Sequence, residues 1–453
     1  MRTLEKSFTI SYYSNYINMN FMPRILSNQL KEKIGEEVEL WGRAYSLRAL
    51  SDELVFLNLQ DRGGIIQVVF EGDDAKGLNI KVGSIVKIFG TVKEEKRAAL
   101  GVEIQGKKVE TLETPEDEMP FDISKKALKV DLSTLLDNRP LTIRHETVRS
   151  IFNVYDTVLG AYAEKMRELE CKEIKTPKIL GAASEGGANF FTLDYFDKKA
   201  FMAQSPQFYK QMCVGAFERV FEIGPAFRAE RSFTTRHVNE YISLDAEFGF
   251  IESFEDIMDI HEEVLKHIFK KIEEKNQADL KLHNAELPSV PDKFPRIKLA
   301  DMKKIIKERY GYDVPKETDI DPQGEVYACQ YAKEEFGSDF IFLTHYPRPE
   351  RPFYTMPAKD NPEETESFDL IFKGLEITTG SQRIHKYNDL VESMKDFGLD
   401  PKDFGFYLET FKYAMPAHGG WGMGSERIVY KLLNLGSIKE AILFPRDVKR
   451  LHP

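Results

Sequence analysis

Two arginines that lie far apart in the chain stand in two different local patterns. Arg228 belongs to the string Phe-Arg-Ala-Glu at 227–230, which precedes a polar loop and an alternating strand pattern at 241–248. Arg427 ends a glycine-rich string at 419–427 and opens an apolar helical pattern. Because the chain contains no Gly-x-x-x-x-Gly-Lys-Ser/Thr loop, a bound phosphate would be held by guanidinium groups instead of a backbone cradle. The pair therefore predicts a site that clamps a polyphosphate from two sides.

Length and composition limit the class of protein. A chain of 453 residues exceeds one ordinary hydrophobic core, so two or three domains are expected. Three widely spaced cysteines favour neither a disulfide framework nor a zinc site, and they indicate a reducing cytoplasm. The longest apolar stretches are too short for a membrane helix. The net charge of −11 does not indicate an RNA partner, but a local basic groove decides phosphate contacts.

The N-terminal part predicts a tail and a small barrel. Residues 1–22 show no clear period and no cleavable signal, so they predict a disordered tail or an upstream, wrongly assigned start. Within 23–112, short strands separated by glycine turns are expected at 38–43, 54–59, 65–70, 85–92 and 102–109. Five such strands suit an OB-type barrel, which binds oligonucleotides on its second and third strands. Any other small β-barrel would fit the same pattern.

The rest of the chain predicts an α+β domain. Residues 113–140 are polar and suit a linker. Helical spacing is clear at 149–170, 254–275 and 299–310, and a short strand is expected at 173–177. Strands alternate with turns at 202–250 and 340–383. Blocks of strands with helices outside them predict a catalytic domain at 141–453 built on an antiparallel sheet.

Four more strings carry a family resemblance: Ala-Ser-Glu-Gly-Gly (183–187), Ala-Gln-Ser-Pro-Gln-Phe-Tyr-Lys-Gln (203–211), Gly-Leu-Glu-Ile-Thr-Thr-Gly-Ser-Gln-Arg-Ile-His (374–385) and Phe-Pro-Arg-Asp (444–447). With the arginine strings, which resemble motifs 2 and 3, they make residues 23–453 resemble the class II aminoacyl-tRNA synthetases, in particular aspartyl-tRNA synthetases of the archaeal and eukaryotic type. The spacing between motif 2 and Glu376 leaves no room for the large inserted domain of the bacterial type. The resemblance implies an aspartate–tRNA ligase that uses ATP and Mg²⁺.

The resemblance also implies roles for residues around the nucleotide. Arg228 and Arg427 would be the catalytic pair, with Arg228 bridging the α-carboxylate of aspartate and the α-phosphate of ATP. Glu230 would accept a hydrogen bond from the adenine amino group, and Tyr241 and Arg427 would lie on opposite faces of the adenine ring. The residues implied to contact ATP are Arg228, Ala229, Glu230, Arg236, His237, Val238, Tyr241, Glu376, Gly424, Ser425, Glu426 and Arg427.

The same resemblance implies an aspartate pocket and a metal site. Lys210 and Arg383 would pair with the side-chain carboxylate of the substrate, and Glu185 and Gln207 would hold its ammonium group. Arg228 and Thr379 complete the implied set for aspartate. Glu376 and Thr379 offer the hard oxygen ligands that Mg²⁺ prefers.

The predicted partners are tRNA-Asp and a second copy of the chain. In the barrel, Phe56 matches an aromatic residue that stacks on an anticodon base, and Gln67 is a candidate for reading a base edge. Tyr45 lies where relatives have Trp or His near the third anticodon position, which leaves open whether tRNA-Asn is also charged. The pattern at 149–177 resembles motif 1, the dimer interface of the family, although a core amphipathic helix would show the same period.

Three other functions fit parts of the pattern. Asparaginyl-tRNA synthetases are close relatives, but they generally lack the lysine found here at Lys210. A non-catalytic RNA-binding paralogue would be expected to have lost some of Arg228, Glu230, Glu376, Arg383 and Arg427, which are all present here. A tRNA-independent amide-forming enzyme on the same catalytic fold is disfavoured by the attached barrel.

Overall fold

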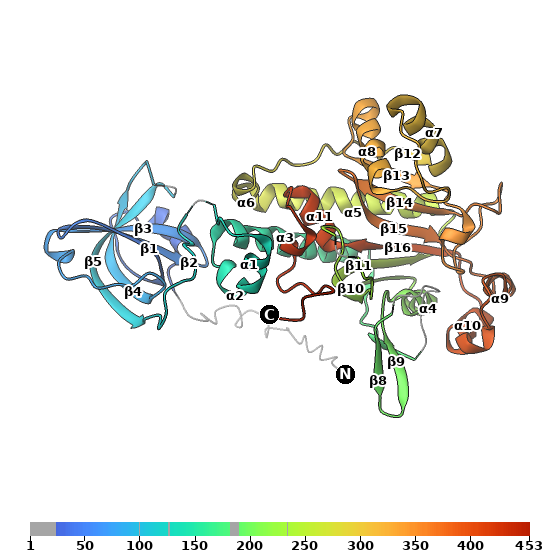
Figure 1. Ribbon diagram of the computed structural model, residues 1–453, viewed down its shortest axis with the longest axis horizontal. Helices are drawn as coiled ribbons and strands as arrows, with labels where there is room; N and C mark the ends of the chain where they lie inside the picture. The colour runs from blue at the N-terminus through green and yellow to red at the C-terminus, as the bar shows by residue number, and fades with distance from the viewer. Residues whose placement is uncertain (1–23, 99, 126, 182–189, 233) are drawn as a thin grey trace, which may run out of the picture. The chain divides into compact units, whose positions relative to one another are not determined.

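The chain, analysed as a computed structural model, divides into two compact units at Met1–Leu128 and Lys129–Pro453 (Figure 1). The structure describes residues 24–98, 100–125, 127–181, 190–232 and 234–453. The predicted tail at 1–22 lies outside the described residues. The predicted boundaries at 112 and 140 stay predictions.

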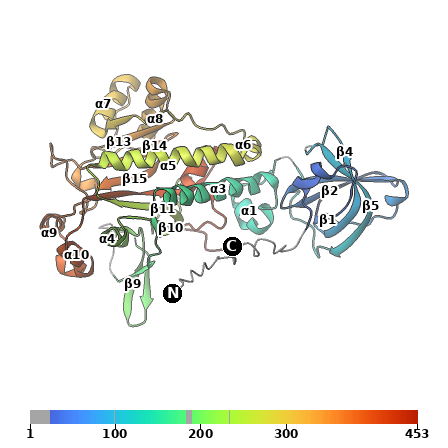
Figure 2. The same cartoon turned by 180° about the vertical axis from the view of Figure 1, so that it is seen from behind.

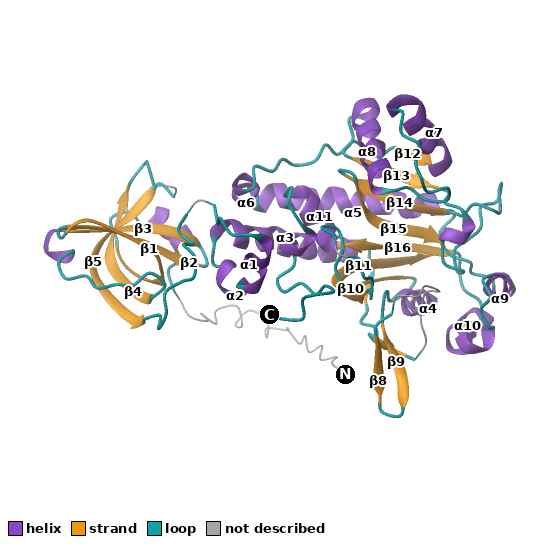
Figure 3. Ribbon diagram, in the orientation of Figure 1, coloured by secondary structure: helices purple, strands orange, loops and turns teal. Residues whose placement is uncertain are grey.

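Five strands of the first unit close into a barrel in the order β1-β2-β3-β5-β4 (Figure 3). Side chains alternate between the barrel interior and its outer surface, and Leu57, Leu59 and Val68 are fully buried. This alternation is what produced the sequence pattern. The five strands predicted from the sequence are confirmed, as β1 (Glu37–Ser51), β2 (Leu54–Asp61), β3 (Gly64–Glu71), β4 (Ile85–Glu94) and β5 (Val102–Glu113), accompanied by the 3₁₀ helices η1 (Ser27–Lys33) and η2 (Gly72–Asp74).

The second unit is built on an eight-stranded sheet in the order β12-β13-β14-β15-β16-β11-β10-β6. All neighbouring strands are antiparallel except the pairs at the two ends, β12–β13 and β10–β6. The predicted α+β class on an antiparallel sheet is confirmed. The strands are β6 (Lys172–Glu173), β10 (Arg219–Phe227), β11 (Glu240–Gly249), β12 (Arg296–Lys298), β13 (Phe340–Thr344), β14 (Ser367–Phe372), β15 (Leu375–Gln382) and β16 (His418–Gly424).

Two long helices, α3 (Glu146–Glu168) and α5 (Phe254–Lys275), run side by side across one face of this sheet (Figure 2). Their apolar faces share one core with Leu244, Ala246 and Phe248 of β11. The helices predicted at 149–170, 254–275 and 299–310 are confirmed, the last as α7 (Leu299–Tyr310). No helix among the described residues is both long enough and apolar enough to cross a bilayer.

The remaining elements lie around the sheet. A small three-stranded sheet is formed by β7 (Ile179–Leu180), β9 (Lys198–Met202) and β8 (Thr192–Tyr195). The other helices are α1 (Leu132–Asp137), α2 (Arg139–Thr142), α4 (Gln207–Phe217), α6 (Gln277–Leu282), α8 (Pro322–Phe336), α9 (Tyr387–Asp396), α10 (Gly405–Lys412) and α11 (Ser425–Leu432), with 3₁₀ turns η3 (Arg348–Glu350), η4 (Pro401–Phe404) and η5 (Ile438–Ala441).

Two details of the sequence prediction are wrong. The strand expected at 173–177 is only the two-residue β6, because Thr176 instead donates its backbone N–H and its hydroxyl to the Glu222 carboxylate. The segment 202–250 contains the helix α4 as well as β10 and β11. Buried polar residues on α4, among them Lys210 and Gln211, masked the apolar period by which a helix is recognised.

β16 is rich in glycine because its neighbours approach it closely from both sides. A Cβ atom at Gly420 would lie 2.0 Å from the Ala246 carbonyl oxygen of β11, and one at Gly419 would lie 2.8 Å from the Ser381 carbonyl oxygen of β15. At Gly422 the nearest atom would be 3.3 Å away, in the Asp245 carboxylate. Glycine in a strand interior marks such close approach of another backbone.

We therefore expect Gly420→Ala to destabilise the protein by about 1–3 kcal/mol, the usual cost of overpacking a core. The matched control is Gly422→Ala, which should cost less, because its nearest neighbour would lie 3.3 Å away. Urea unfolding followed by tryptophan fluorescence suits this test, because Trp421 is fully buried in the same strand. Equal stability of the two variants would contradict the close-approach argument.

Candidate active site

One cavity over the sheet brings together the two arginine strings. Arg228, at the end of β10, and Arg427, in the first turn of α11, both line it. The sheet face opposite α3 and α5 supplies its floor, because Ser243 and Asp245 alternate along β11 with the core residues. The other predicted residues that line it are Gln207, Lys210, Glu230, Arg236, His237, Val238, Tyr241, Glu376, Thr379, Arg383, Gly424 and Glu426.

The motif 2 side of the cavity is an arginine above an aromatic ring. The Arg228 guanidinium lies 5.5 Å from the centre of the Tyr241 ring, and its Nη1 is 3.9 Å from Glu230 Oε1. The Arg228 backbone N–H donates to the Asn239 carbonyl, which fixes the start of the loop. The Arg228 side chain is 45% exposed and lines the cavity.

The motif 3 side joins α11 to β15. Arg427 Nη1 donates to the Glu376 carbonyl oxygen at 2.7 Å and lies 3.3 Å from Glu376 Oε1. Thr379 donates its hydroxyl to the same Glu376 oxygen at 3.2 Å. Arg427, Glu376 and Thr379 therefore form one polar cluster at this end of the cavity.

Two residues beside Arg427 are engaged by the protein itself. Ser425 is buried and donates to the Ile242 carbonyl, and the Glu426 carboxylate accepts the Ile242 N–H and the Tyr155 hydroxyl. Burial raises the pKa of Glu426 to about 6. These contacts tie α11 to β11 and α3, and they hold Arg427 at the cavity edge.

The loop between β10 and β11 adds more cationic groups. Burial lowers the pKa of His237, and Arg427, Arg236 and Arg228 lower it further against the opposing effect of Glu230. Like charges that lower one imidazole pKa must converge on the same space. The arrangement suits a ligand with several negative charges.

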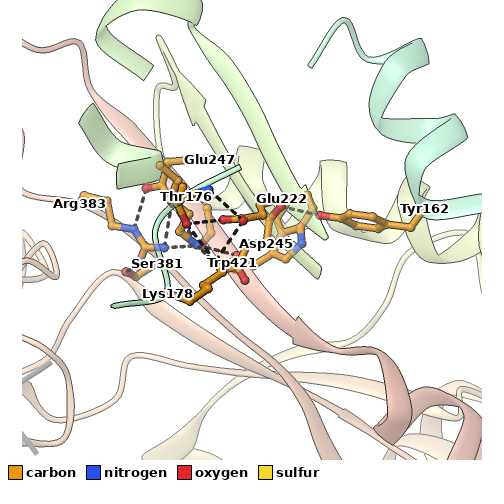
Figure 4. A network of polar contacts seen from close by, with 11 residues as sticks. Tyr162, Thr176, Lys178, Glu222, Asp245, Glu247, Ser381, Arg383 and Trp421 are labelled. Atoms are coloured by element: carbon orange, nitrogen blue, oxygen red, sulfur yellow. Dashed lines mark hydrogen bonds and ion pairs between the residues drawn. The ribbon is translucent and has the colours of Figure 1, made fainter. Parts of the chain in front are cut away.

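Four buried charges lie at the inner end of the cavity, and Figure 4 labels three of them, Asp245, Glu247 and Arg383. Lys210 Nζ on α4 is 3.0 Å from Asp245 Oδ1 and 3.5 Å from Glu247 Oε2 on β11. Arg383, just after β15, donates from Nε to Glu247 Oε1 at 2.8 Å. All four side chains are at most 6% exposed.

This cluster differs from a purely cationic pocket. Burial alone would raise the pKa of Glu247, but Arg383 and Lys210 hold it below its usual value, so the carboxylate is ionised at neutral pH. Two buried cations therefore face two buried carboxylates, and only Asp245 of the two carboxylates lines the cavity. Sequence reasoning missed Asp245 and Glu247, although the alternation of polar and apolar residues at 243–248 signalled a strand with one polar face.

A further missed acid lies beside Glu376. Asp369 on β14 pairs with Thr379 across the strands, and its Oδ2 is 2.9 Å from Arg351 Nη2. Its other oxygen, Oδ1, is buried with no hydrogen-bond partner among the described residues. Burial raises the pKa of Asp369 to about 6 against the effect of Arg351, and Glu376 raises it further. An unpartnered carboxylate oxygen close to a second acid fits a divalent cation.

The remaining predicted residues lie elsewhere. Ala229 lines a second cavity, next to Arg231 and Arg446, and Glu185 is outside the described residues. Phe56 and Gln67 lie on the outer face of β2 and β3, and Gln67 donates to Glu103 at 3.0 Å. Tyr45 is 6% exposed and donates its hydroxyl hydrogen to the Ile123 carbonyl.

Comparison with known proteins gives consistent matches. A family model described as "tRNA synthetases class II (D, K and N)" matches residues 131–448, and one described as "OB-fold nucleic acid binding domain" matches residues 39–112. The aspartate–tRNA(Asp/Asn) ligase of Thermus thermophilus is 43% identical over 95% of this chain and all of its own length. The aspartate–tRNA(Asp) ligase of Pyrococcus abyssi is 39% identical over 94% of this chain and 99% of its own.

Structural comparison supports these sequence matches. The asparaginyl-tRNA synthetase of Pyrococcus horikoshii, in complex with asparaginyl-adenylate, superposes with a TM-score of 0.88. It is 30% identical and covers 95% of this chain and 100% of its own. The catalytic fold and the barrel are thus shared with synthetases for two amino acids.

We expect Glu247→Gln to lower the free energy of unfolding at pH 7 by about 3–5 kcal/mol, because it leaves Arg383 as an uncompensated buried cation, whereas Lys210 keeps Asp245 as a partner. Since folding lowers the pKa of Glu247, the wild type should lose this contribution as the pH falls through the carboxyl range, and the difference between the two proteins should shrink. Urea unfolding at several pH values measures both effects.

The matched control is Glu240→Gln, which removes an exposed carboxylate from the same strand. It should change stability by less than about 0.5 kcal/mol, as surface substitutions usually do. A loss in Glu247→Gln no larger than this would mean that the buried cations do not depend on Glu247.

Proposed function

The chain belongs to the class II aminoacyl-tRNA synthetases and is an aspartate–tRNA ligase that uses ATP, and we propose that the cavity between Arg228 and Arg427 is where it forms aspartyl-adenylate. The observation that carries this proposal is the convergence of both arginines and the buried Lys210 cluster on one cavity. A polyphosphate and an acidic amino acid would then lie next to each other.

The first reaction joins aspartate to the nucleotide. An α-carboxylate oxygen of aspartate attacks the α-phosphorus of ATP, the bond to the bridging oxygen breaks, and pyrophosphate leaves. Negative charge builds on the α-phosphate oxygens, where Arg228 donates hydrogen bonds that strengthen in the transition state. Arg427, with Arg236 and His237, holds the leaving phosphates. No protein nucleophile takes part, so catalysis consists of positioning and charge stabilisation.

The second reaction transfers aspartate to tRNA. A hydroxyl of the 3′-terminal adenosine attacks the carbonyl carbon of aspartyl-adenylate, and AMP leaves with the bonding electrons. The proton of that hydroxyl passes to the departing phosphate or to water. In this proposal Arg228 stabilises the charge that returns to the α-phosphate.

The inner end of the cavity suits aspartate. Lys210 and Arg383 would pair with the side-chain carboxylate of the substrate, and Asp245 and Gln207 would accept its ammonium hydrogens. Because Glu247 and Asp245 balance the two cations, the empty pocket carries no large excess charge, which reduces the cost of burying it. An asparagine amide would leave cationic donors facing an NH₂ group.

Magnesium fits at the acidic pair. Glu376, with Thr379, and the unpartnered Asp369 oxygen offer hard oxygen ligands near the predicted phosphate position. When bound, Mg²⁺ would neutralise negative charge on the phosphates. Arg427 would keep its hydrogen bond to the Glu376 carbonyl oxygen when the metal is bound.

We also infer a homodimer. The α3–β6 segment resembles the interface motif of the family, and β6 is the edge strand of the eight-stranded sheet. Exposed sheet edges are usually covered by another chain or element. Size-exclusion chromatography with light scattering tests this inference.

We propose that the enzyme charges both tRNA-Asp and tRNA-Asn with aspartate. The relative with 43% identity carries both tRNAs in its name. Tyr45, near the implied position of the third anticodon base, is buried and hydrogen-bonded, so its ring is not presented for stacking. Phe56, on the outer barrel face, would stack on a base that both anticodons share.

Lys210→Met should lower kcat/KM for aspartate in ATP–pyrophosphate exchange by about 100-fold or more, because it removes a buried partner of the substrate carboxylate. The KM for ATP should stay near the wild-type value. Lys198→Met, on the exposed part of β9, is the control and should leave exchange unchanged. Exchange driven by asparagine in the wild type would contradict the proposed specificity.

Transcribed tRNA-Asp and tRNA-Asn should both accept radiolabelled aspartate from the wild-type protein. Phe56→Ala should weaken the charging of both tRNAs, and the increase in the KM for tRNA should correspond to about 1–3 kcal/mol of lost stacking. Aspartate–pyrophosphate exchange serves as the control, since it needs no anticodon contact. Charging of tRNA-Asp alone would contradict the proposed scope.

A further inference from the structure

An ion pair between a partly exposed arginine and a buried acid lies at the phosphate end of the cavity. Arg236, from the loop between β10 and β11, donates from Nη2 to Glu325 Oε2 at 2.5 Å. Glu325 stands in the first turn of α8, and its side chain is only 10% exposed. Arg236 lines the cavity, whereas Glu325 is not among the residues that line it. The carboxylate therefore contacts the cavity through this arginine.

The same arginine also contacts the strand that carries Glu376. Arg236 Nη2 donates to the Gly374 carbonyl at 2.6 Å, in the turn between β14 and β15. α8 packs directly on this turn, because a Cβ atom at Gly374 would lie 2.9 Å from Val326 Cγ2. Gly374 has a φ of +72°, which favours glycine there in any case. Arg236 is thus held by two groups that are themselves packed against each other.

The surroundings of Glu325 disfavour its ionised form. Burial raises its pKa to about 7, against the effect of Arg236, and nearby Glu376 raises it further. A buried ion pair contributes little net stability compared with apolar residues of the same volume. Strongly perturbed acids beside a ligand cavity are more often found at functional sites.

We propose that Glu325 is a positioning residue for nucleotide binding, which holds the Arg236 guanidinium at the Glu376–Arg427 end of the cavity before ATP arrives. This rests on the proposed function, in which Arg236 contacts the phosphates. A free arginine side chain populates many rotamers, and binding would have to order it. With Glu325 and Gly374 in place, that ordering is completed on folding, and ATP meets a pre-oriented donor.

The negative charge of Glu325 also offsets part of the positive charge of this end of the cavity in the absence of nucleotide. Arg236 and Arg427 both bear on this carboxylate, and each lowers its pKa. A polyphosphate that enters the cavity would meet guanidinium groups whose remaining donors are free to turn toward it. An arginine has five N–H donors in a fixed fork, so it can keep Glu325 and bind a phosphate oxygen together.

The test uses aspartate-dependent ATP–pyrophosphate exchange with the full-length protein. Glu325→Gln should raise the KM for ATP about tenfold, the scale of one charge-assisted hydrogen bond, and leave the KM for aspartate unchanged. Glu325→Asp, which keeps the charge on a shorter side chain, should recover part of the loss. Glu334→Gln is the matched control, because it removes an exposed acid of the same helix that pairs with Arg309.

Arg236→Ala separates this inference from the proposed function. If Glu325 acts through Arg236, the double variant Arg236→Ala/Glu325→Gln should have the same KM for ATP as Arg236→Ala alone. An unchanged KM for ATP in Arg236→Ala would overturn the assignment of Arg236 to phosphate binding. A raised KM in Arg236→Ala but not in Glu325→Gln would overturn the positioning role alone. Equal changes for both substrates, with a lower melting temperature, would mean that Glu325 is only structural.

Discussion

The four buried charges on α4, β11 and the end of β15 are the interaction on which the rest of the site depends. Lys210 pairs with Asp245 and Glu247, and Arg383 pairs with Glu247, so Glu247 contacts both cations. A lone buried cation would require several kcal/mol of compensation, whereas this set is paired throughout. The pairing fixes the helix and the two strands relative to one another. It also leaves cationic donors at the cavity floor, where an acidic side chain can join an existing network.

The sheet makes that arrangement possible through two properties of its strands. Alternation along β11 sends Leu244, Ala246 and Phe248 into the core with α3 and α5 and sends Asp245 and Glu247 to the opposite face. The absence of side chains at Gly419 and Gly420 of β16 allows β15 and β11 to approach this strand closely. Without those glycines the three strands would move apart, and the residues that they carry would no longer surround one cavity. Core packing and ligand geometry are therefore set by the same strands.

Much of this could be predicted from sequence because the signals were local or belonged to a family pattern. The alternation of apolar and polar residues predicted the barrel strands, and apolar residues at helical spacing predicted α3 and α5. The family strings pointed to Arg228, Lys210, Glu376 and Arg427 as site residues. The roles of these residues remain predictions, although the structure brings them to one cavity. The carboxylate partners of Lys210 and Arg383 could not be derived, because a pairing between α4, β11 and the end of β15 depends on tertiary packing. α4 was missed for a related reason, since polar residues turned inward to the site interrupt its apolar period.

Glu325 shows why an active site extends beyond the residues that its motifs contain. Its helix lies outside the recognised strings, and nothing in the local sequence of α8 distinguishes it from Glu334 or Glu335 on the same helix. The difference is burial, because Glu325 faces the turn that carries Gly374 and receives Arg236, while Glu334 pairs with an arginine at the surface. Burying a carboxylate costs free energy, and it is useful where the carboxylate holds in place a group that would otherwise be mobile in water. Here the group that it fixes is a flexible cation at the point where phosphates would enter.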